Sequence, residues 1–449
     1  MRIGIDITAA VRQGAGIGRF TREIVRALLA LDDTRLRSHH FVLLAATAGL
    51  PRASWQPRLD YITQPAGAGD VRFATPALAK RSAGASVCNL SFVSDDWLHR
   101  LWHRARLPVP VELALGRLDL FHEPDFVLPP TLRGTLTLLT VHDLTFKRDP
   151  DSAYPKLRRY LDRVVPASVQ RASHVLADST ATKDDLVELF GTPPDKISVI
   201  LGGVEKRFAP VTDPERLAAV RRKYALGDGP FILGLGTIQP RKNYRRLIQA
   251  FLIVNCQLLT VNGQLASPVA KPGGTQYGEQ SIQNSKPTQG VENLKLVIAG
   301  GKGWLYEDIF AEVKRLGLEG SVVFPGFVDD DDLPALYSAA SVLAYPSLYE
   351  GFGLPVLEAM ACGTPVVTSN VSSLPEVAGV AALTVTPTDV DALGGALLAV
   401  LTDEALRRQM IERGLVHACR FTWEDSARQL LAAYERVAAQ AKSPIANRQ

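Results

Sequence analysis

Short apolar runs alternate along this chain with stretches in which apolar residues recur every three or four positions. The short runs are typical of buried strands, and the longer period is typical of amphipathic helices. Their alternation predicts parallel sheets covered by helices, so the predicted fold class is α/β. The predicted strands are residues 2–7, 41–45, 118–122, 135–141, 174–177, 197–200, 231–236, 294–299, 321–324, 341–345 and 365–368.

The length of the chain and the order of its elements predict two domains. At 449 residues the chain exceeds the usual size of a single core. Residues 207–230 are rich in Pro, Asp and Gly around one short helical stretch, so we place a hinge near residues 205–215. The predicted domains are residues 1–208 and 209–422, and a final helical stretch follows at 423–449.

The composition is that of a globular protein, with 46% hydrophobic and 21% charged residues. The four cysteines are scattered without ligand spacing, which favours a reducing compartment and predicts neither a disulfide framework nor a zinc site. The N-terminus lacks a signal-peptide progression, and no stretch approaches 18 uninterrupted apolar residues. We therefore expect a cytoplasmic protein, either free or peripheral at the inner face of the cytoplasmic membrane.

The formal net charge of +4 is unevenly distributed. Through Asp213 the chain has 28 Lys and Arg against 23 Asp and Glu, or +5, which leaves −1 for the remainder. An excess of positive charge in the first half favours an anionic acceptor or membrane surface there.

Two segments depart from the regular pattern. Residues 257–290 are rich in Gln, Asn, Ser, Gly and Pro, which predicts an inserted flexible surface loop. Residues 91–110 contain WLHRLWHRARLPVP, in which Trp and Leu are interleaved with Arg. This segment is interpreted either as a basic helix at a lipid interface or as an ordinary helix that buries Leu98, Leu101 and Trp102. Both interpretations stay open.

Two glutamates, Glu350 and Glu358, lie eight positions apart in SLYEGFGLPVLEAMACGTPVV. The preceding SVLAYPS predicts a buried strand, and residues 354–361 have a helical pattern that Gly363 and Pro365 close. A helix N-terminus at this place has unpaired N–H groups that suit a diphosphate. The two carboxylates could then accept hydrogen bonds from the sugar and ribose hydroxyls of a nucleotide sugar. The alternative is that Glu350 only caps the helix and that Glu358 is solvated.

The longer string SLYEGFGLPVLEAMACGTPVVTSNVSSLPEVAG resembles the donor-site signature of the retaining GT-B glycosyltransferases of family 4 (group 1), whose hallmark is Glu, seven residues, Glu. The likeness continues in GTIQPRKNYRRLIQAF, KLVIAGGKGW, VVFPGFVDDDDLPALYSAA and the N-terminal MRIGIDITAAVRQGAGIGRFTREIVRAL. It implies the GT-B fold, in which two doubly wound Rossmann-like domains face a central cleft. It also implies that the last helix returns to the first domain.

The resemblance assigns the donor to the second domain. There Glu358 is expected to hold the ribose, and Glu350 the sugar hydroxyls together with the backbone of Gly351, Phe352, Gly353 and Leu354. Arg241 and Lys242 follow a predicted strand end, and paired cations there can neutralise a departing nucleoside diphosphate. Taken alone, the pair is more simply interpreted as serving surface solubility, and its place beside the strand end of Glu350 favours the functional interpretation. Some relatives carry an arginine where this chain has Thr237.

In the first domain, Gly16 and His142 are the candidate site residues. Gly14, Gly16 and Gly18 form a loop between a strand and a helix, where the backbone can approach a phosphate or only make a tight turn. His142 ends a predicted strand, and the family places a histidine here beside the donor sugar. It could move a proton or only orient the sugar, and it could also be an ordinary core or capping histidine. His122 and Asp143 are lower-ranked neighbours.

A metal site is not expected. The acidic residues 329–332 are interpreted as a helix start, where acids cap the helix and complement its dipole. No other group of residues indicates a metal, which agrees with a GT-B enzyme that acts without Mg²⁺ or Mn²⁺.

The predicted function is transfer of a hexose, with retention, from a nucleotide diphosphate sugar to a saccharide or lipid-linked oligosaccharide in polysaccharide or glycolipid synthesis. The segments GTIQPRKN and SSLPEVAG are most similar in sequence to bacterial mannosyltransferases that use GDP-mannose, so GDP-mannose is the expected donor. The alternatives are a UDP-sugar donor and a non-catalytic nucleotide-sugar-binding protein. A nicotinamide-dependent oxidoreductase is disfavoured because neither glycine loop has the dinucleotide fingerprint. No nucleic-acid partner is expected.

Overall fold

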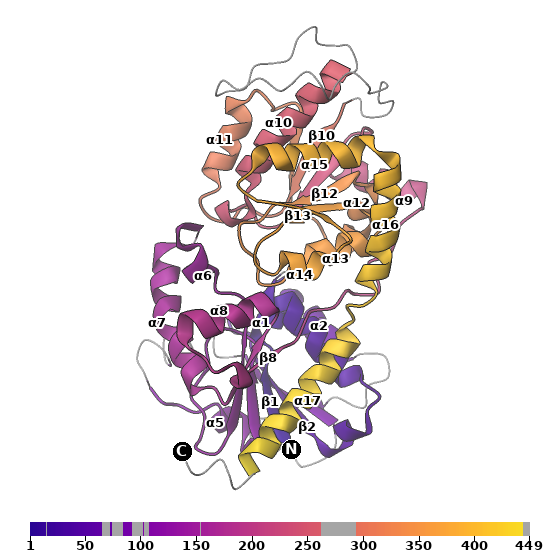
Figure 1. The fold of residues 1–449 in the computed structure, drawn as a ribbon. Coiled ribbons are helices and arrows are strands. Elements are labelled where there is room, and N and C mark those ends of the chain that lie inside the picture. The colour runs from indigo at the N-terminus through magenta and orange to yellow at the C-terminus, as the bar shows by residue number, and fades with distance from the viewer. Residues whose placement is uncertain are drawn as a thin grey trace. The chain divides into compact units, whose positions relative to one another are not determined.

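The protein consists of two compact units, each built on a parallel sheet (Figure 1). A computed structural model describes residues 1–14, 16–64, 72–73, 84–91, 102, 107–152, 154–261 and 293–442. Unit 1 comprises Met1–Lys147, Pro155–Gly203 and Phe421–Gln449, and unit 2 comprises Arg148–Tyr154 and Val204–Arg420. The chain therefore contributes the short segment Arg148–Tyr154 to unit 2, passes into unit 2 again after Gly203 and returns to unit 1 after Arg420.

The sheet of unit 1 has the strand order β3-β4-β2-β1-β5-β6-β7-β8, and every pair in it is parallel. The order reverses direction between β1 and β5. The strands are β1 (Arg2–Asp6), β2 (His40–Ala46), β3 (Arg72–Phe73), β4 (Gly84–Leu90), β5 (Leu120–Glu123), β6 (Leu136–Val141), β7 (His174–Ala177) and β8 (Ile197–Val199).

The sheet of unit 2 has the order β11-β10-β9-β12-β13-β14, again with parallel pairs throughout. Here the order reverses between β9 and β12, which is the place where ligands bind in open α/β sheets. The strands are β9 (Phe231–Leu235), β10 (Lys295–Ala299), β11 (Val322–Gly326), β12 (Val342–Tyr345), β13 (Val366–Ser369) and β14 (Leu383–Val385).

Helices connect the strands in both units. Those of unit 1 are α1 (Thr8–Arg12), α2 (Ile17–Ala30), α3 (Arg52–Thr63), α5 (Glu112–Leu115), α6 (Thr145–Arg148, whose last residue belongs to unit 2), α7 (Pro155–Arg171), α8 (Thr180–Phe190) and α17 (Trp423–Lys442). Those of unit 2 are α9 (Pro214–Lys223), α10 (Tyr244–Val261), α11 (Glu307–Arg315), α12 (Leu333–Ala339), α13 (Leu354–Ala361), α14 (Leu374–Ala378), α15 (Val390–Thr402) and α16 (Glu404–Ala418). Short 3-10 turns are η1 (Thr34–Ser38), η3 (Pro150–Ser152), η4 (Pro194–Lys196) and η5 (Pro240–Lys242).

The structure confirms the predicted α/β class. All eleven predicted strands are present, β7 with the predicted bounds and the others with one or both ends shifted. In unit 2, one buried cluster joins the sheet to α10, α11 and α15 through residues such as Phe251, Val313 and Leu397. This packing follows from the predicted pattern, because apolar residues at helical spacing form the stripe that faces the sheet. The strands β3, β4 and β14 were not predicted.

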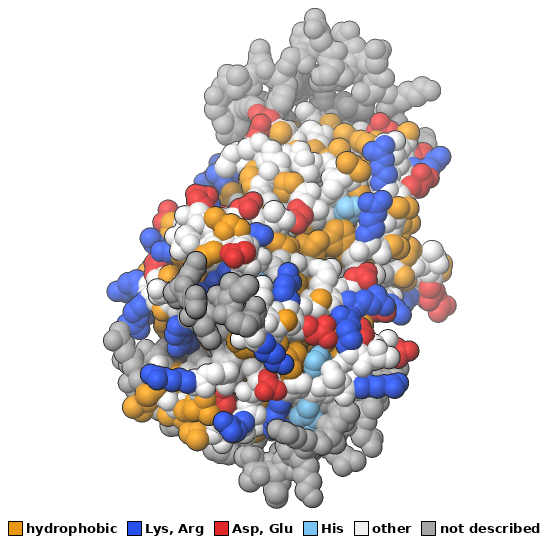
Figure 2. All heavy atoms as spheres, turned by 60° about the horizontal axis from the view of Figure 1, so that its bottom comes forward, with side chains coloured by type: hydrophobic (Ala, Val, Ile, Leu, Met, Phe, Trp, Pro, Cys, Tyr) orange, Lys and Arg blue, Asp and Glu red, His pale blue; other side chains and the backbone are white. Residues whose placement is uncertain are grey.

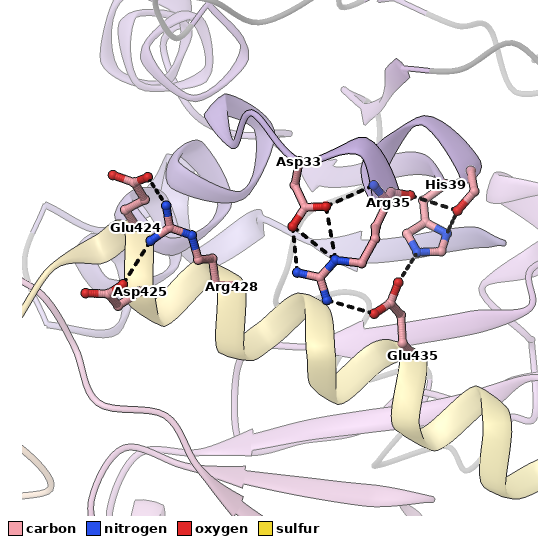
Figure 3. Close-up of polar contacts among 8 residues, drawn as sticks. Asp33, Arg35, His39, Glu424, Asp425, Arg428 and Glu435 are labelled. Carbon is pink, nitrogen blue, oxygen red and sulfur yellow. Dashed lines mark hydrogen bonds and ion pairs between the residues drawn. The ribbon is translucent and has the colours of Figure 1, made fainter.

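The C-terminal helix α17 packs on unit 1. Its Tyr434 is fully buried, and the Tyr434 hydroxyl lies 2.8 Å from His122 Nδ1. The Ser426 hydroxyl donates to the Leu201 carbonyl at 2.6 Å. At the surface, Arg35 joins Asp33 and Glu435 of α17 (Figure 3). The buried contacts hold the helix, because exposed ion pairs contribute little.

Two predicted segments need correction or lie partly outside the described residues. Residues 257–261, which open the predicted inserted loop, are helical because α10 continues to Val261. Residues 262–290 lie outside the described part. Of the predicted interfacial segment, residues 92–101 and 103–106 are also not described, whereas Trp102 packs partly buried against the unit 1 core and donates to the Val109 carbonyl at 2.9 Å.

The acidic run before α12 does not cap that helix with its side chains. Asp332 is the N-cap residue, but it makes no side-chain cap hydrogen bond. Instead Lys223 Nζ pairs with Asp329 and Asp332 at 2.7 and 2.6 Å, and the Tyr224 hydroxyl donates to Asp332. The prediction of capping was wrong because a cation from α9 competes for these carboxylates.

The surface has mixed charge. On the face shown in Figure 2, basic and acidic side chains are interspersed. In the part of the chain that the structure describes, no helix is both long and apolar enough to cross a membrane.

The fit of α17 against unit 1 depends on Gly203. A Cβ added at Gly203 would overlap the backbone nitrogen of Trp423 and lie 2.5 Å from the Thr422 carbonyl carbon. We predict that Gly203→Ala lowers the free energy of unfolding by about 1–3 kcal/mol, the usual cost of overpacking, in urea denaturation. Gly320→Ala is the control, because nothing lies within 4 Å of its added Cβ. Equal unfolding midpoints for the two variants would contradict this packing.

Candidate functional site

The candidate site lies at the carboxyl edge of the unit 2 sheet, where three loops meet. Strand β9 lies beside β12, with Ile232 opposite Val342, and β12 lies beside β13. Because neighbouring parallel strands end at the same edge, the segments that follow them come together. These segments are residues 236–243 after β9, 346–353 after β12 and 370–373 after β13.

A buried ion triad joins the first two segments. Arg241 Nη1 donates to Glu350 Oε2 at 2.6 Å, and Lys242 Nζ donates to Glu350 Oε1 at 2.6 Å. The Glu350 side chain is 8% exposed, that of Lys242 9% and that of Arg241 17%. The structure thus brings together the predicted basic pair and the predicted carboxylate, although their positions in the sequence are more than 100 residues apart.

The triad keeps Glu350 ionised. Burial by itself would raise the pKa of Glu350, but the charges of Arg241 and Lys242 outweigh it and lower the pKa to about 2. A carboxylate in this state accepts hydrogen bonds and does not act as a general acid at neutral pH. It is therefore suited to electrostatic and positioning roles.

Hydrogen bonds also fix the backbone of the loops. The Arg241 carbonyl accepts the N–H of Leu348 at 2.9 Å, and Asn243 Nδ2 donates to the Pro346 carbonyl at 2.9 Å. On the other side, the Ser373 hydroxyl donates to the carbonyls of Glu350 and Phe352 at 2.9 and 2.7 Å. The triad therefore rests on a preformed frame.

Two glycines make this frame possible. Gly353 precedes α13 with φ of 114°, a left-handed conformation, and a Cβ there would lie 2.9 Å from Leu374. Gly236 has φ of 139°, and a Cβ there would lie 3.0 Å from Lys242 Cε. Side chains at these positions would strain the backbone and crowd the cation. With Gly351, Phe352 and Leu354, Gly353 forms the turn that leads into the helix.

Glu358 lies one turn inside α13. It is 2% exposed, and its Oε2 accepts the Tyr337 hydroxyl at 2.8 Å. The possibility of a solvated helix residue is therefore wrong for Glu358. A hydroxyl already donates to this carboxylate, and the ribose role is assessed below as a proposal.

In unit 1, Gly16 caps α2 with φ of 58° and ψ of −126°. The carbonyls of the same loop are held by Arg22, whose guanidinium donates to Ala10, Gln13 and Gly14. Gly18 is needed for a different reason, because a Cβ there would lie 2.6 Å from the Ala9 carbonyl oxygen. Gly14 and Gly16 of the glycine loop lie between α1 and α2, and not directly after the first strand as expected, because α1 follows β1.

His142 lies at the end of β6, with both ring nitrogens engaged. Its Nδ1 lies 2.6 Å from Asp178 Oδ2, and its Nε2 lies 2.8 Å from the Pro124 carbonyl. Burial alone would lower its pKa, but the charges of Asp178 and Asp125, together with the hydrogen bonds of the ring, raise it to about 9. At neutral pH the imidazolium therefore donates from both nitrogens, and it is not placed as a general base.

The lower-ranked candidates His122 and Asp143 form hydrogen bonds within unit 1. Both ring nitrogens of His122 meet hydroxyls, those of Tyr434 and Thr140, and burial lowers the pKa of His122 to about 3. It is therefore neutral. Asp143 accepts the N–H of Thr145 at 2.9 Å.

Sequence reasoning missed residues that form hydrogen bonds with the predicted site residues in both units. Asp178 directly follows β7, and β6 pairs with β7 through Val141 and Ala177, so the register alone places Asp178 beside His142. A search for polar residues after every strand would have found it. Tyr345, whose hydroxyl accepts Lys242 Nζ at 2.6 Å, appeared only as an apolar strand residue.

Within the described ranges, no group of three or more His, Cys, Asp or Glu side chains could hold a metal ion. Action without a metal stays a prediction.

Two parallel α/β units of this topology, with charged residues at the switch point of the second, define a GT-B fold. Among solved structures, a sucrose-phosphate synthase from Thermosynechococcus elongatus matches with a TM-score of 0.63, 20% identity, and coverage of 98% of this chain and 100% of that chain. HepE of Anabaena, in complex with UDP and glucose, matches with a TM-score of 0.64, 17% identity, and coverage of 97% and 100%. These likenesses support the fold.

Sequence comparison shows the family. The Glycosyltransferase Family 4 model matches residues 15–208, and the Glycosyl transferases group 1 model matches 279–417. The chain is 36% identical to O-antigen chain mannosyltransferase B of Escherichia coli over 317 residues, which are 70% of this chain and 74% of that protein. It is 31% identical to the serotype-specific mannosyltransferase WbdA of Escherichia coli over 70% of this chain, but spans only 36% of that protein.

The chain therefore belongs to the family 4 (group 1) glycosyltransferases, and it is a hexosyltransferase. The matched ranges include Gly16, His142, Glu350 and Glu358, whereas Arg241 and Lys242 lie between them.

The His142–Asp178 pair predicts a pH-dependent contribution to stability. The pKa of His142 is about 9 in the folded protein, above its ordinary value of 6.5. The stabilisation is therefore complete below pH 6.5 and is lost as the pH rises through 9. We predict that Asp178→Asn lowers the free energy of unfolding by about 3 kcal/mol near pH 6.5, and that the difference shrinks towards pH 10.

Urea denaturation of both proteins between pH 6 and pH 10 measures this dependence. Asp184→Asn, which changes an exposed carboxylate on α8, should leave the profile unchanged. A difference between wild type and Asp178→Asn that stays constant with pH would contradict the assigned charge state.

Proposed function

We propose that the protein transfers a hexose, with retention, from a nucleotide diphosphate sugar to a saccharide or lipid-linked oligosaccharide acceptor in polysaccharide or glycolipid synthesis. The observation that carries this proposal is the convergence of Arg241, Lys242 and Glu350 at the switch point of the unit 2 sheet. Family membership and the O-antigen mannosyltransferase relative support the broader activity.

In this proposal the donor binds along the carboxyl edge of the unit 2 sheet. Arg241 and Lys242 hold the diphosphate, because paired cations neutralise the charge that develops on a departing phosphate. Glu358 accepts the ribose hydroxyls. Glu350 and the backbone from Gly351 through Leu354 contact the hexose, close to the first turn of α13, whose N–H groups favour an anion.

The chemistry proceeds on one face of the sugar ring. The bond between the anomeric carbon and the phosphate oxygen breaks, and the acceptor oxygen bonds to the same carbon from the same side. The acceptor proton passes to the departing phosphate oxygen, so the reaction balances without another base. We assign no metal to this step, because Arg241 and Lys242 supply the positive charge.

We assign the acceptor and His142 to unit 1. Both N–H groups of the His142 imidazolium are engaged in hydrogen bonds, to Asp178 and to the Pro124 carbonyl. This supports a role in orienting the sugar over a role in proton transfer. The backbone at Gly16 is proposed to contact the donor phosphate. The excess positive charge of the first half of the sequence supports an anionic acceptor.

Peripheral membrane contact through residues 91–110 is the remaining part of the proposal. Four apolar residues in and after this segment are exposed. Leu107 is 48% exposed, Val109 36%, Leu113 74% and Leu132 47%. Arg117 and Arg133, which are close to Leu113 and Leu132 in the sequence, are also exposed. Exposed apolar side chains flanked by arginines support an interfacial surface.

The donor is proposed to be GDP-mannose, on the strength of the mannosyltransferase relatives. A UDP-sugar is the second candidate, because the fold neighbour HepE is solved with UDP-glucose. We predict nucleotide release with GDP-mannose that depends on a lipid-linked oligosaccharide, and little release with UDP-sugars. Release assays with each donor, with and without acceptor, measure this. Binding without any release would instead indicate a non-catalytic nucleotide-sugar-binding protein.

The role of Glu350 predicts the effect of its removal. Glu350→Ala should abolish sugar transfer while the protein stays folded, because the two cations lose their carboxylate and the hexose loses a contact. Turnover and circular dichroism measure the two parts. Glu404→Ala, an exposed glutamate on α16, is the control. Unchanged turnover in Glu350→Ala would refute the assignment.

A further inference from the structure

The Glu350 carboxylate forms ion pairs with both of the cations that are proposed to bind the donor diphosphate. One carboxylate oxygen lies 2.6 Å from Arg241 Nη1, and the other lies 2.6 Å from Lys242 Nζ. Two positive charges and one negative charge sum to +1 at the place assigned to a group that carries two or more negative charges. A single side chain therefore halves the local positive charge.

The cations cannot move away from this carboxylate without breaking other contacts. Lys242 Nζ donates to the Tyr345 hydroxyl and lies 4.7 Å from the Tyr345 ring centroid. Arg241 Nη1 also donates to the Tyr349 carbonyl at 2.8 Å. Because the backbone of both residues is held by the neighbouring loops, Glu350 acts on both charges at short range.

We propose that Glu350 sets how tightly the site holds a nucleoside diphosphate, by offsetting one of the two cationic charges that bind it. This proposal rests on the proposed function and adds to the sugar contact a second role for Glu350, as a positioning residue that acts through Arg241 and Lys242. The diphosphate has to share the cations with the carboxylate, so its binding is weakened. The product nucleoside diphosphate, which lacks the sugar, is then released more readily.

This role differs from sugar binding in a measurable way, because a nucleoside diphosphate has no hexose. A carboxylate that only contacts the hexose has no effect on the affinity for GDP or UDP. A carboxylate that offsets the cations weakens that affinity. Removing its charge while keeping its shape, as in Glu350→Gln, separates the two roles.

Isothermal titration of GDP and of UDP into wild type and Glu350→Gln tests the proposal. We expect the Kd of the nucleoside diphosphate that wild type binds to fall on the order of tenfold in Glu350→Gln, as removal of one adjacent charge predicts. Residual turnover, where measurable, should show stronger inhibition by that product. Glu350→Asp keeps the charge and should keep a Kd near that of wild type.

Glu312→Gln is the matched control. Glu312 is also buried and ion-paired in unit 2, to Arg315 at 2.6 Å, but on α11. Its substitution should leave the Kd unchanged, which separates local charge from general destabilisation. If Glu350→Gln does not fold, Glu350→Ala removes the same charge and gives the same expected change.

An unchanged or weaker affinity in folded Glu350→Gln overturns this inference and leaves the proposed function standing. Failure of wild type to bind either GDP or UDP has a different meaning, because it refutes the proposed donor site itself. The two failures are therefore distinguishable in one set of titrations.

Discussion

The ion triad of Arg241, Glu350 and Lys242 is the interaction on which the candidate site depends. A buried charge that loses its partner costs about 3–5 kcal/mol, a large share of the roughly 5–15 kcal/mol that separate folded from unfolded protein. Here each buried charge has its partner at 2.6 Å, so the cluster can exist inside the fold. Such a cluster is costly to keep for stability alone, because apolar residues often do as well. Its position at a switch point agrees with the donor-binding role proposed for it.

Topology explains how residues so distant in the sequence come together. In an all-parallel sheet every strand ends at the same edge, and each following loop carries its polar residues there. The reversal between β9 and β12 places the loop with the basic pair next to the loop with Glu350. Unit 1 repeats the principle on a smaller scale, where β6 and β7 place His142 beside Asp178. In unit 2 the two cations keep a buried carboxylate ionised, and in unit 1 a buried carboxylate raises the pKa of the histidine beside it.

Much of this arrangement could be predicted from the sequence. Strands buried on both faces are apolar throughout, so the central strands were recognisable, and the bounds of α13 matched the predicted residues 354–361. The unpredicted strand β4 is GASVCNL, whose small and polar residues weaken the apolar signal, and β14 has only three residues. The convergence of Arg241, Lys242 and Glu350 followed from placing each at a strand end. Their ion pairing did not follow, because it depends on side-chain conformation.

The same limit explains the other differences. The acidic residues before α12 were expected to cap it, but Lys223 lies more than 100 residues earlier and its contact with them is set by packing of α9 on α12. His142 was recognised as a strand-end histidine, yet its protonation depends on Asp178 from another strand. The local sequence pattern predicts where a residue lies on a strand or helix, whereas tertiary contacts determine which side chains it pairs with.

A crystal structure of the protein with GDP-mannose tests the central claim most directly. The account predicts electron density for the diphosphate within hydrogen-bonding distance of Arg241 and Lys242, with the ribose at Glu358 and the hexose beside Glu350. Density for the nucleotide sugar at any other place on the protein, with the triad unchanged, would contradict it.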